Sequence, residues 1–347
     1  MNEPMPTTVR IAQLVDLWDR LQSIRALQAS FEPWFSLVLF IAGSLIMIWR
    51  LGAMERKGLE GTVLGTLVMP YASGFSNLSF AYVLGRSAGN GVLVLENCLV
   101  NNVTNLTLLI GLPALIWSLN LFPERSRGWR GYTAKTCRLN YLSLLLTLIA
   151  ALFFGGTLWA LSRDGLLDFS DGLVLGGVFL FWQIFHVFDV LKNNVHRGRS
   201  LEWTILADML LVVGAGWTVY IAIEGLVAWI PREGTGFFVF KNIGWLSGFL
   251  MVLPNALSAF YYAFTRRADI VYSSQIGDGH ICIPMCIGLF ALFARIPTPQ
   301  FLDFGLLLIA GAGLAHFLFI ALFGRLPRFM GFGLTAAYGL FIYRGLL

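Results

Sequence analysis

Residues 92–115, VLVLENCLVNNVTNLTLLIGLPAL, have the length of a membrane-spanning helix but carry polar side chains along one face. About 20 residues at a rise of about 1.5 Å each cross the hydrocarbon core. At roughly 100° per residue, Glu96 borders a face that holds four polar residues, Asn97, Asn101, Thr104 and Asn105. Polar groups at that depth are costly unless they meet protein, water or an ion. A single amide is typical of a helix–helix contact, whereas this stripe indicates the lining of a polar site.

The composition is that of a membrane protein. The chain of 347 residues is 57% hydrophobic and 12% charged, whereas soluble domains carry about 25% charged residues. The net charge of +5 is therefore interpreted as a signal of membrane topology, counted for each loop separately. Neither nucleic acid nor nucleotide is expected as a partner. The cysteines lack disulfide or zinc spacing and are interpreted as small core residues; they are Cys98, Cys137, Cys282 and Cys286.

Ten apolar segments predict an all-α integral membrane protein with ten transmembrane helices. The predicted spans are 33–52, 61–85, 92–118, 139–161, 171–191, 203–229, 237–264, 270–293, 301–323 and 326–345. They follow an N-terminal segment, residues 1–32, in which apolar side chains recur at helical spacing among charged ones. That pattern predicts an amphipathic helix over residues 8–31, lying on the surface of the lipid bilayer.

The basic residues of the loops predict the topology. The loops after odd-numbered spans hold 15 Lys and Arg residues, and those after even-numbered spans hold 5. The positive-inside rule then places the odd loops in the cytoplasm and both termini outside. The lack of a leader sequence and the compact build favour a bacterial inner membrane. Acidic residues near span ends, including Asp208, are expected to be hydrated.

Two predicted spans contain a proline that is expected to interrupt the helix, Pro70 in the second and Pro254 in the seventh. Each is followed by a polar span, and the second of these carries Ser274, Gln275, Asp278 and Cys282 on one face. The two regions are about 177 residues apart, which aligns Asn101 with Asp278 and Asn105 with Cys282. We therefore predict two five-helix repeats, residues 33–191 and 203–345. An odd number of spans per repeat gives them opposite orientations, with a site near the membrane midplane.

These motifs resemble those of the calcium:cation antiporter superfamily, which includes the sodium/calcium exchangers. Each repeat of that family has a motif close to G-T-S-L-P-E/D and, about two dozen residues later, G-N-x-x-G-S-N-I-x-N/D. The chain has SGFSN ending at Asn77 and ENCLVNNVTN ending at Asn105, then LPN ending at Asn255 and SSQIGDGHIC ending at Cys282. The motif acids are replaced by Asn77 and Asn255, and acids stand instead at Asp278 and Glu96.

The resemblance implies a secondary antiporter that moves an inorganic cation, first of all Ca2+, against Na+ or H+ by alternating access. The candidate cation-binding residues are Ser73, Asn77, Glu96, Asn101, Asn105, Asn255 and Asp278, and the metal ligands among them are Asn77, Asn105, Asn255 and Asp278. Oxygens of this kind suit hard cations. A carboxyl group within the membrane can also carry a proton. No other cofactor is expected.

Several alternatives remain open at this stage. Asp278 could pair with an arginine, and Glu96 could be hydrated near the outer interface. The loss of the motif acids also fits a paralogue that keeps the fold but regulates instead of transporting. An enzyme is not expected, because the sequence lacks a histidine cluster and an HExxH motif. The scattered histidines, His186, His280 and His316, are interpreted as core or interface residues.

Overall fold

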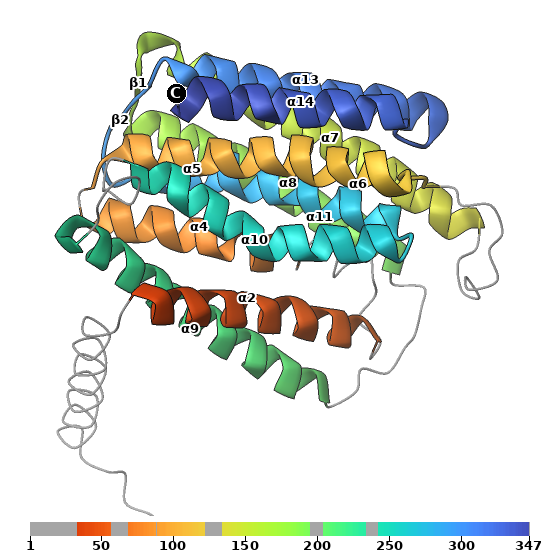
Figure 1. Ribbon diagram of the computed structural model, residues 1–347, viewed down its shortest axis with the longest axis horizontal. Helices are drawn as coiled ribbons and strands as arrows, with labels where there is room; N and C mark the ends of the chain where they lie inside the picture. The colour runs from red at the N-terminus through yellow and green to blue at the C-terminus, as the bar shows by residue number, and fades with distance from the viewer. Residues whose placement is uncertain are drawn as a thin grey trace, which may run out of the picture.

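The computed structural model describes residues 33–56, 69–87, 89–121, 134–194, 204–233 and 242–346. Within these ranges the chain is almost entirely helical, and its long helices run across the molecule in layers (Figure 1). One short antiparallel pair, β1 (Leu166–Leu167) with β2 (Ile296–Pro297), joins a loop of the first half to a loop of the second. The predicted amphipathic helix over residues 8–31 lies outside the described residues.

The first half begins with the helix α2 (Pro33–Arg56) and the helix α4 (Met69–Arg86). The polar span is a continuous rod made of α5 (Gly91–Val103), the π-helical turn η2 (Thr104–Leu108) and α6 (Leu109–Trp117). It starts where the Asn90 side chain caps the helix by accepting a hydrogen bond from the backbone N–H of Val92 at 3.0 Å. After it come α7 (Ala134–Leu161), the 3-10 turn η3 (Ser162–Asp164) and α8 (Phe169–Asn194).

The second half repeats this order. It contains α9 (Thr204–Glu233) and α10 (Ile243–Phe264), followed by the second polar span. That span comprises α11 (Ala268–Ile281), the π turn η5 (Cys282–Cys286) and α12 (Ile287–Ala291). The last helices are α13 (Phe301–Phe323) and α14 (Arg328–Leu346). Gly324 ends α13 in the left-handed conformation, with a φ of 62°, which glycine adopts without steric cost.

Each of the ten predicted spans overlaps one of these helical rods in the described part of the chain. Six of the described helices are long and apolar enough to cross a membrane, and they support an integral membrane protein; they are Pro33–Arg50, Gly91–Trp117, Tyr141–Asp164, Leu206–Trp229, Ile243–Phe264 and Phe301–Phe323. Crossing of the membrane by all ten rods stays a prediction.

The predicted interruption at Pro254 is wrong. The helix α10 runs without a break from Ile243 to Phe264, with Pro254 inside it. A proline removes one backbone donor and displaces one carbonyl, and here the helix continues through that local loss. Pro70 is the second residue of α4, a position where its missing N–H costs nothing. The irregular backbone lies instead in the polar spans, at η2 and η5.

Corresponding residues of the two halves make corresponding contacts. The turns η2 and η5 begin 178 residues apart, close to the offset that aligns the motifs. Gly111 packs so closely on α14 that a Cβ atom would lie 2.9 Å from Leu334 Cβ and 3.0 Å from the Gly331 carbonyl oxygen. A Cβ atom on its counterpart Gly288 would lie 3.1 Å from Leu175 Cβ and 3.2 Å from the Gly172 carbonyl oxygen of α8. Glycine is needed in both places because the backbones touch, which supports a repeated architecture.

The helices α2 and α9 form a layer of their own at one edge of the molecule, where they pack mainly against each other (Figure 1). Their apolar spans are each 28% buried, against 78% for Gly91–Trp117, so the first polar span lies deep inside the bundle. Within the edge layer, Arg50 Nη1 of α2 lies 3.3 Å from Asp208 Oδ1 of α9, and Asp208 is 2% exposed. The expectation that Asp208 is hydrated is therefore wrong, since a buried carboxylate is retained where a cation pairs with it.

Candidate cation site

The carboxylate of Asp278, on α11, is fully buried between the two halves of the molecule. Its Oδ2 atom accepts a hydrogen bond of 2.8 Å from Asn105 Nδ2 in η2 and one of 3.3 Å from Asn255 Nδ2 in α10. Hydrogen bonds to a charged acceptor are stronger than those between neutral groups. The structure thus brings together three residues that the sequence proposed as ligands, from three separate segments of the chain.

Asn101 and Cys282 complete the surroundings of this carboxylate. Asn105 Nδ2 also donates to Asn101 Oδ1 at 2.8 Å. The Cys282 thiol lies 3.7 Å from Asn101 Oδ1 and 3.9 Å from Asp278 Oδ2. Cys98 and Cys286 are also fully buried, so these cysteines lie in the core as predicted. The position of Cys282 beside Asp278 was missed, and the alignment of Asn105 with Cys282 was the signal for it.

Several buried polar atoms of the candidate ligands lack a hydrogen-bond partner among the described residues. They include the Oδ1 atom of Asn105, the Nδ2 atom of Asn101 and both amide atoms of Asn77. Asn77 lies on α4, which packs tightly on α11, since a Cβ on Gly74 would lie 2.8 Å from Ile281 Cβ. Buried polar groups are nearly always paired with protein, water or a ligand. These amides are therefore suited to a polar or ionic ligand.

A cation at this centre would need amide oxygens. Within the described ranges, no three His, Cys, Asp or Glu side chains are grouped as the ligands of a metal ion. The donor set around Asp278 fits a cation in another way, because carboxylate and amide oxygens are the ligands of hard cations. Asn101 Oδ1 already faces this centre, and an amide that now donates can turn its oxygen toward a bound cation.

Two predicted ligands are not placed at this centre. Glu96 lies nine residues before Asn105, about 14 Å further along the rod at the helical rise. It packs on the start of α10, where a Cβ on Gly244 would collide with the Glu96 side chain. Ser73 belongs to α4, and its side chain is outside the part of the structure described.

Residues 34–188 match the family model described as sodium/calcium exchanger protein. This match covers most of the first predicted repeat, including the segment that holds Asn77, Asn101 and Asn105. The match and the fold described below support the resemblance to the calcium:cation antiporter superfamily that the motifs indicated.

The fold of this chain is similar to that of the sodium-calcium exchanger NCX_Mj. The NCX_Mj structure soaked with 2.5 mM Na+ and 10 mM Sr2+ aligns with a TM-score of 0.63 at 20% identity, covering 90% of this chain and 96% of that one. The structure soaked with zero Na+ and Ca2+ aligns with a TM-score of 0.61 at 20% identity, covering 92% and 99%. At this identity the likeness shows the shared fold. No curated protein matches the chain.

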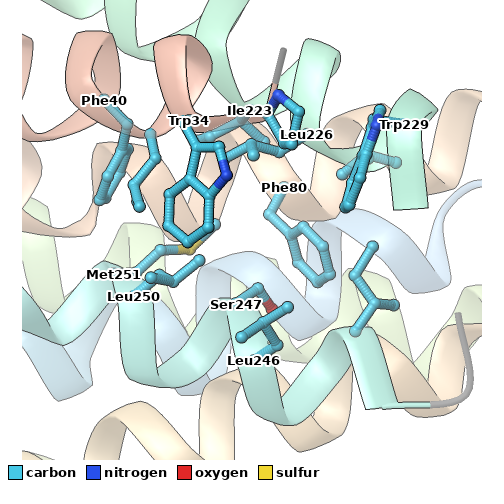
Figure 2. A pocket seen from close by; sticks show the side chains of 14 residues that line it. Trp34, Phe40, Phe80, Ile223, Leu226, Trp229, Leu246, Ser247, Leu250 and Met251 are labelled. Atoms are coloured by element: carbon cyan, nitrogen blue, oxygen red, sulfur yellow. The ribbon is translucent and has the colours of Figure 1, made fainter. Parts of the chain in front are cut away.

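A second feature of the molecule is an apolar cavity of about 230 Å³ between the α2–α9 layer and the rest of the bundle. Figure 2 shows Trp34 and Trp229 on the side of the layer, with Ser247 and Met251 of α10 facing them. The floor of the cavity touches the polar stripe, because Asn97 Nδ2 donates to Ser247 Oγ at 3.0 Å and to Met251 Sδ at 3.4 Å. The full lining is Pro33, Trp34, Leu37, Phe40, Phe80, Ile223, Leu226, Val227, Trp229, Ile243, Leu246, Ser247, Leu250 and Met251.

Two of the histidines have structural contacts, as the sequence predicted. His316 Nε2 lies 2.7 Å from the Leu106 carbonyl oxygen inside η2, and His280 Nε2 lies 2.9 Å from that of Thr147. A carbonyl only accepts, so each of these ring nitrogens carries the proton. His316 thereby ties α13 to the π turn that positions Asn105. The side chain of His186 is outside the described part of the chain.

Proposed function

We propose that the protein is a secondary antiporter that exchanges an inorganic cation for Na+ or H+ by alternating access. The observation that carries this proposal is the buried carboxylate of Asp278, held by amides from both halves of the chain and adjoined by the unpartnered Asn105 Oδ1 atom. An ionisable side chain inside the membrane is costly, and its usual use is in an ion pathway. The matches to the sodium/calcium exchanger family and fold support a transporter over an enzyme.

The ligands of the cation are, in this proposal, the Asp278 carboxylate and the amide oxygens of Asn77, Asn101, Asn105 and Asn255. With one carboxylate the centre neutralises a monovalent cation fully and a divalent cation by half. Ca2+ can still be held, because Ca2+ accepts six to eight neutral and charged oxygens. We keep Glu96 and Ser73 as ligands of an ion on its way to the centre; the packing of Glu96 against Gly244 at the start of α10 supports this role for Glu96.

The architecture suits alternating access. We infer two inverted repeats, residues 33–191 and 203–345, with Asn105, Asn255 and Asp278 at their interface near the membrane midplane. The α2–α9 layer packs mainly on itself and meets the bundle across an apolar cavity. In this proposal the α2–α9 pair shifts as a unit against the fixed site. A bacterial inner membrane with both termini outside remains our proposal for the location.

The test measures the movement of Ca2+ across the membrane of proteoliposomes loaded with Ca2+, under imposed Na+ or H+ gradients. We expect gradient-driven Ca2+ movement in the wild type and a loss of about 100-fold in Asp278→Asn, which corresponds to about 2.7 kcal/mol. The matched control is Asp303→Asn, because that carboxylate is 63% exposed and pairs with Arg163 at the surface; its flux should be unchanged. Flux that persists in Asp278→Asn would remove Asp278 from the centre. No flux of Ca2+, Na+ or K+ would favour the non-transporting paralogue.

A further inference from the structure

A sulfur atom stands where the resemblance leads one to expect an oxygen ligand. The family's second motif ends in Asn or Asp, and the first repeat keeps this residue as Asn105 while the second has Cys282. The Cys282 thiol is fully buried and lies 3.7 Å from Asn101 Oδ1 and 3.9 Å from Asp278 Oδ2. Cys282 is therefore close enough for its sulfur to share a bound ion with the carboxylate after a small side-chain rotation.

Two further buried thiols belong to the same region. Cys98 of α5 and Cys286 of η5 are fully buried, and α5 packs against η5. Of these thiols, Cys282 has the contacts with Asp278 and Asn101 that a ligand of the same ion requires.

An independent observation at the same centre points to a ligand. The amide nitrogen of Asn105 donates to both Asp278 and Asn101, while its Oδ1 atom is buried and has no partner among the described residues. A buried acceptor of this kind is normally satisfied by water or a bound group. The sulfur, the carboxylate and the unpartnered amide oxygen therefore belong to one binding centre.

The mixture of ligand types bears on the ion. Ca2+ and Mg2+ are hard cations that select oxygen ligands, and a sulfur in their shell is unfavourable. Thiolate ligands select softer cations instead. A ligand set with one sulfur, one carboxylate and amide oxygens is intermediate, and it favours cations that accept both sulfur and oxygen. Because Asn101 and Asn105 supply amide oxygens, the proposed ligand set contains only two residues of the His, Cys, Asp or Glu type, Cys282 and Asp278.

We propose that this centre takes a thiophilic divalent cation, of the kind represented by Cd2+ and Zn2+, in preference to Ca2+. The ligands are the Cys282 sulfur, the Asp278 carboxylate and the amide oxygens of Asn101 and Asn105. The inference rests on the proposed antiport function, because it names the cation class of the same site.

The experiment uses the full chain in detergent, with Cd2+ as the probe and a reductant that contains no thiol. Binding is read from the rise in unfolding temperature with ion concentration and from the ultraviolet charge-transfer absorption of a sulfur–cadmium bond. We expect Cd2+ to bind at least tenfold more tightly than Ca2+, with the absorption band present. Cys282→Ser should lose at least tenfold in Cd2+ affinity and most of the band, while its Ca2+ affinity changes less than threefold.

The matched control is Cys286→Ser, one helical turn further along the same segment, because Cys286 is buried like Cys282 and is not one of the proposed ligands. It should keep most of the Cd2+ affinity. Cys282→Asn, which copies Asn105 of the other half, should reverse the preference toward Ca2+ and also serves if the serine variant does not fold. Equal Cd2+ affinity in wild type and Cys282→Ser, or tighter Ca2+ than Cd2+ binding in the wild type, would overturn the inference.

Failure of this inference can be told apart from failure of the antiport proposal. Proteoliposomes that exchange Ca2+ or Na+ but show no preference for Cd2+ would leave the antiporter and remove the thiophilic site. Proteoliposomes that exchange none of Na+, K+, Ca2+ and Cd2+, together with no ion-dependent change in unfolding temperature, would overturn both.

Discussion

The two polar spans at the middle of the molecule share a backbone and differ in chemistry. Each span contains one π turn, η2 or η5. In each span a glycine packs on a glycine and a leucine three residues apart on a neighbouring helix: Gly111 contacts α14 and Gly288 contacts α8. The first span supplies neutral amides such as Asn101 and Asn105. The second supplies the carboxylate of Asp278 and the thiols of Cys282 and Cys286. The geometry of the site therefore depends on both halves, while its charge comes from one.

Moving the carboxylate from the second polar span to the first should have the largest effect on cation affinity. Asn101 and Asp278 occupy corresponding positions, 177 residues apart, on the two spans. If Asp278→Asn lowers cation affinity by about 100-fold, then Asn101→Asp in the same chain should recover at least tenfold, about 1.4 kcal/mol, because the carboxylate returns to the same centre. Ion-dependent unfolding temperature and flux both measure this.

The single variant Asn101→Asp is the control for that exchange of charge. It places two carboxylates at one centre and should favour divalent over monovalent cations, because like charges need a counter-ion. An Asn101→Asp/Asp278→Asn chain that binds no better than Asp278→Asn would show that the two positions are not equivalent, and the view of the halves as matched parts of one site would be wrong.

The crossing point of the two spans offers the next test. Asn102 and Gly279 also correspond, and a Cβ on Gly279 would lie 2.5 Å from Asn102 Oδ1. Asn102 is held there because its Nδ2 atom donates to the Cys98 carbonyl oxygen at 2.7 Å. Gly279→Ala should therefore lower the free energy of unfolding by about 2 kcal/mol, as overpacking does.

The matched control for Gly279→Ala is Gly156→Ala in α7, where a Cβ meets nothing within 4 Å. That change should leave stability equal or raise it by up to about 1 kcal/mol, since alanine favours the helix. Unfolding in detergent compares the two. Equal effects would mean that the spans do not touch at Asn102 and Gly279.

The spans themselves could be predicted because they depend on local properties. Apolar length places each helix, and the alignment of the two halves brings Asn105, Asn255 and Asp278 together without knowledge of the fold. What was missed depends on contacts between distant helices. The sequence places a proline at Pro254 but does not show that α10 continues through it, because neighbouring helices decide whether one lost hydrogen bond ends a helix.

The same limit explains the other errors. The π turns have no sequence pattern that distinguishes them from α-helix, and the cysteines look like ordinary core residues until α5 and η5 are placed side by side. Glu96 borders the amide face on a helical wheel, yet its height along the rod places it against Gly244. A wheel gives the direction of a side chain and not its depth in the bundle.

The two π turns differ in what holds them, and this difference can be measured. Within η5, Pro284 has no backbone N–H, so the regular bond to the carbonyl four residues earlier cannot form. No proline lies within η2, whose Leu106 carbonyl instead accepts a hydrogen bond from His316. His316→Phe should therefore cost about 1–2 kcal/mol of stability by leaving that carbonyl unpaired.

A matched change at the other histidine isolates the π turn. His280→Phe also removes a hydrogen bond to a carbonyl, that of Thr147 in α7. It does not change the hydrogen bond between His316 and the Leu106 carbonyl of η2. Both variants should lose stability, and His316→Phe alone should weaken cation binding, by about threefold, because η2 positions Asn105. Equal loss of binding in the two variants would contradict a specific role of His316 in bracing η2.

The smallest difference should appear at Asn97 and its counterpart Ser274. Asn97 Nδ2 bonds across to Ser247 and Met251 of α10, whereas the Ser274 hydroxyl donates to the Val271 carbonyl oxygen of its own helix. Hydrogen bonds between membrane helices average about 0.6 kcal/mol, so Asn97→Ala should destabilise the protein by about that amount and Ser274→Ala by less. Because Asn97 also holds the floor of the apolar cavity, Asn97→Ala should change the flux rate more than the cation affinity. A change of affinity without a change of rate would place Asn97 at the ion centre, and the first span would then bind the cation along its whole amide stripe.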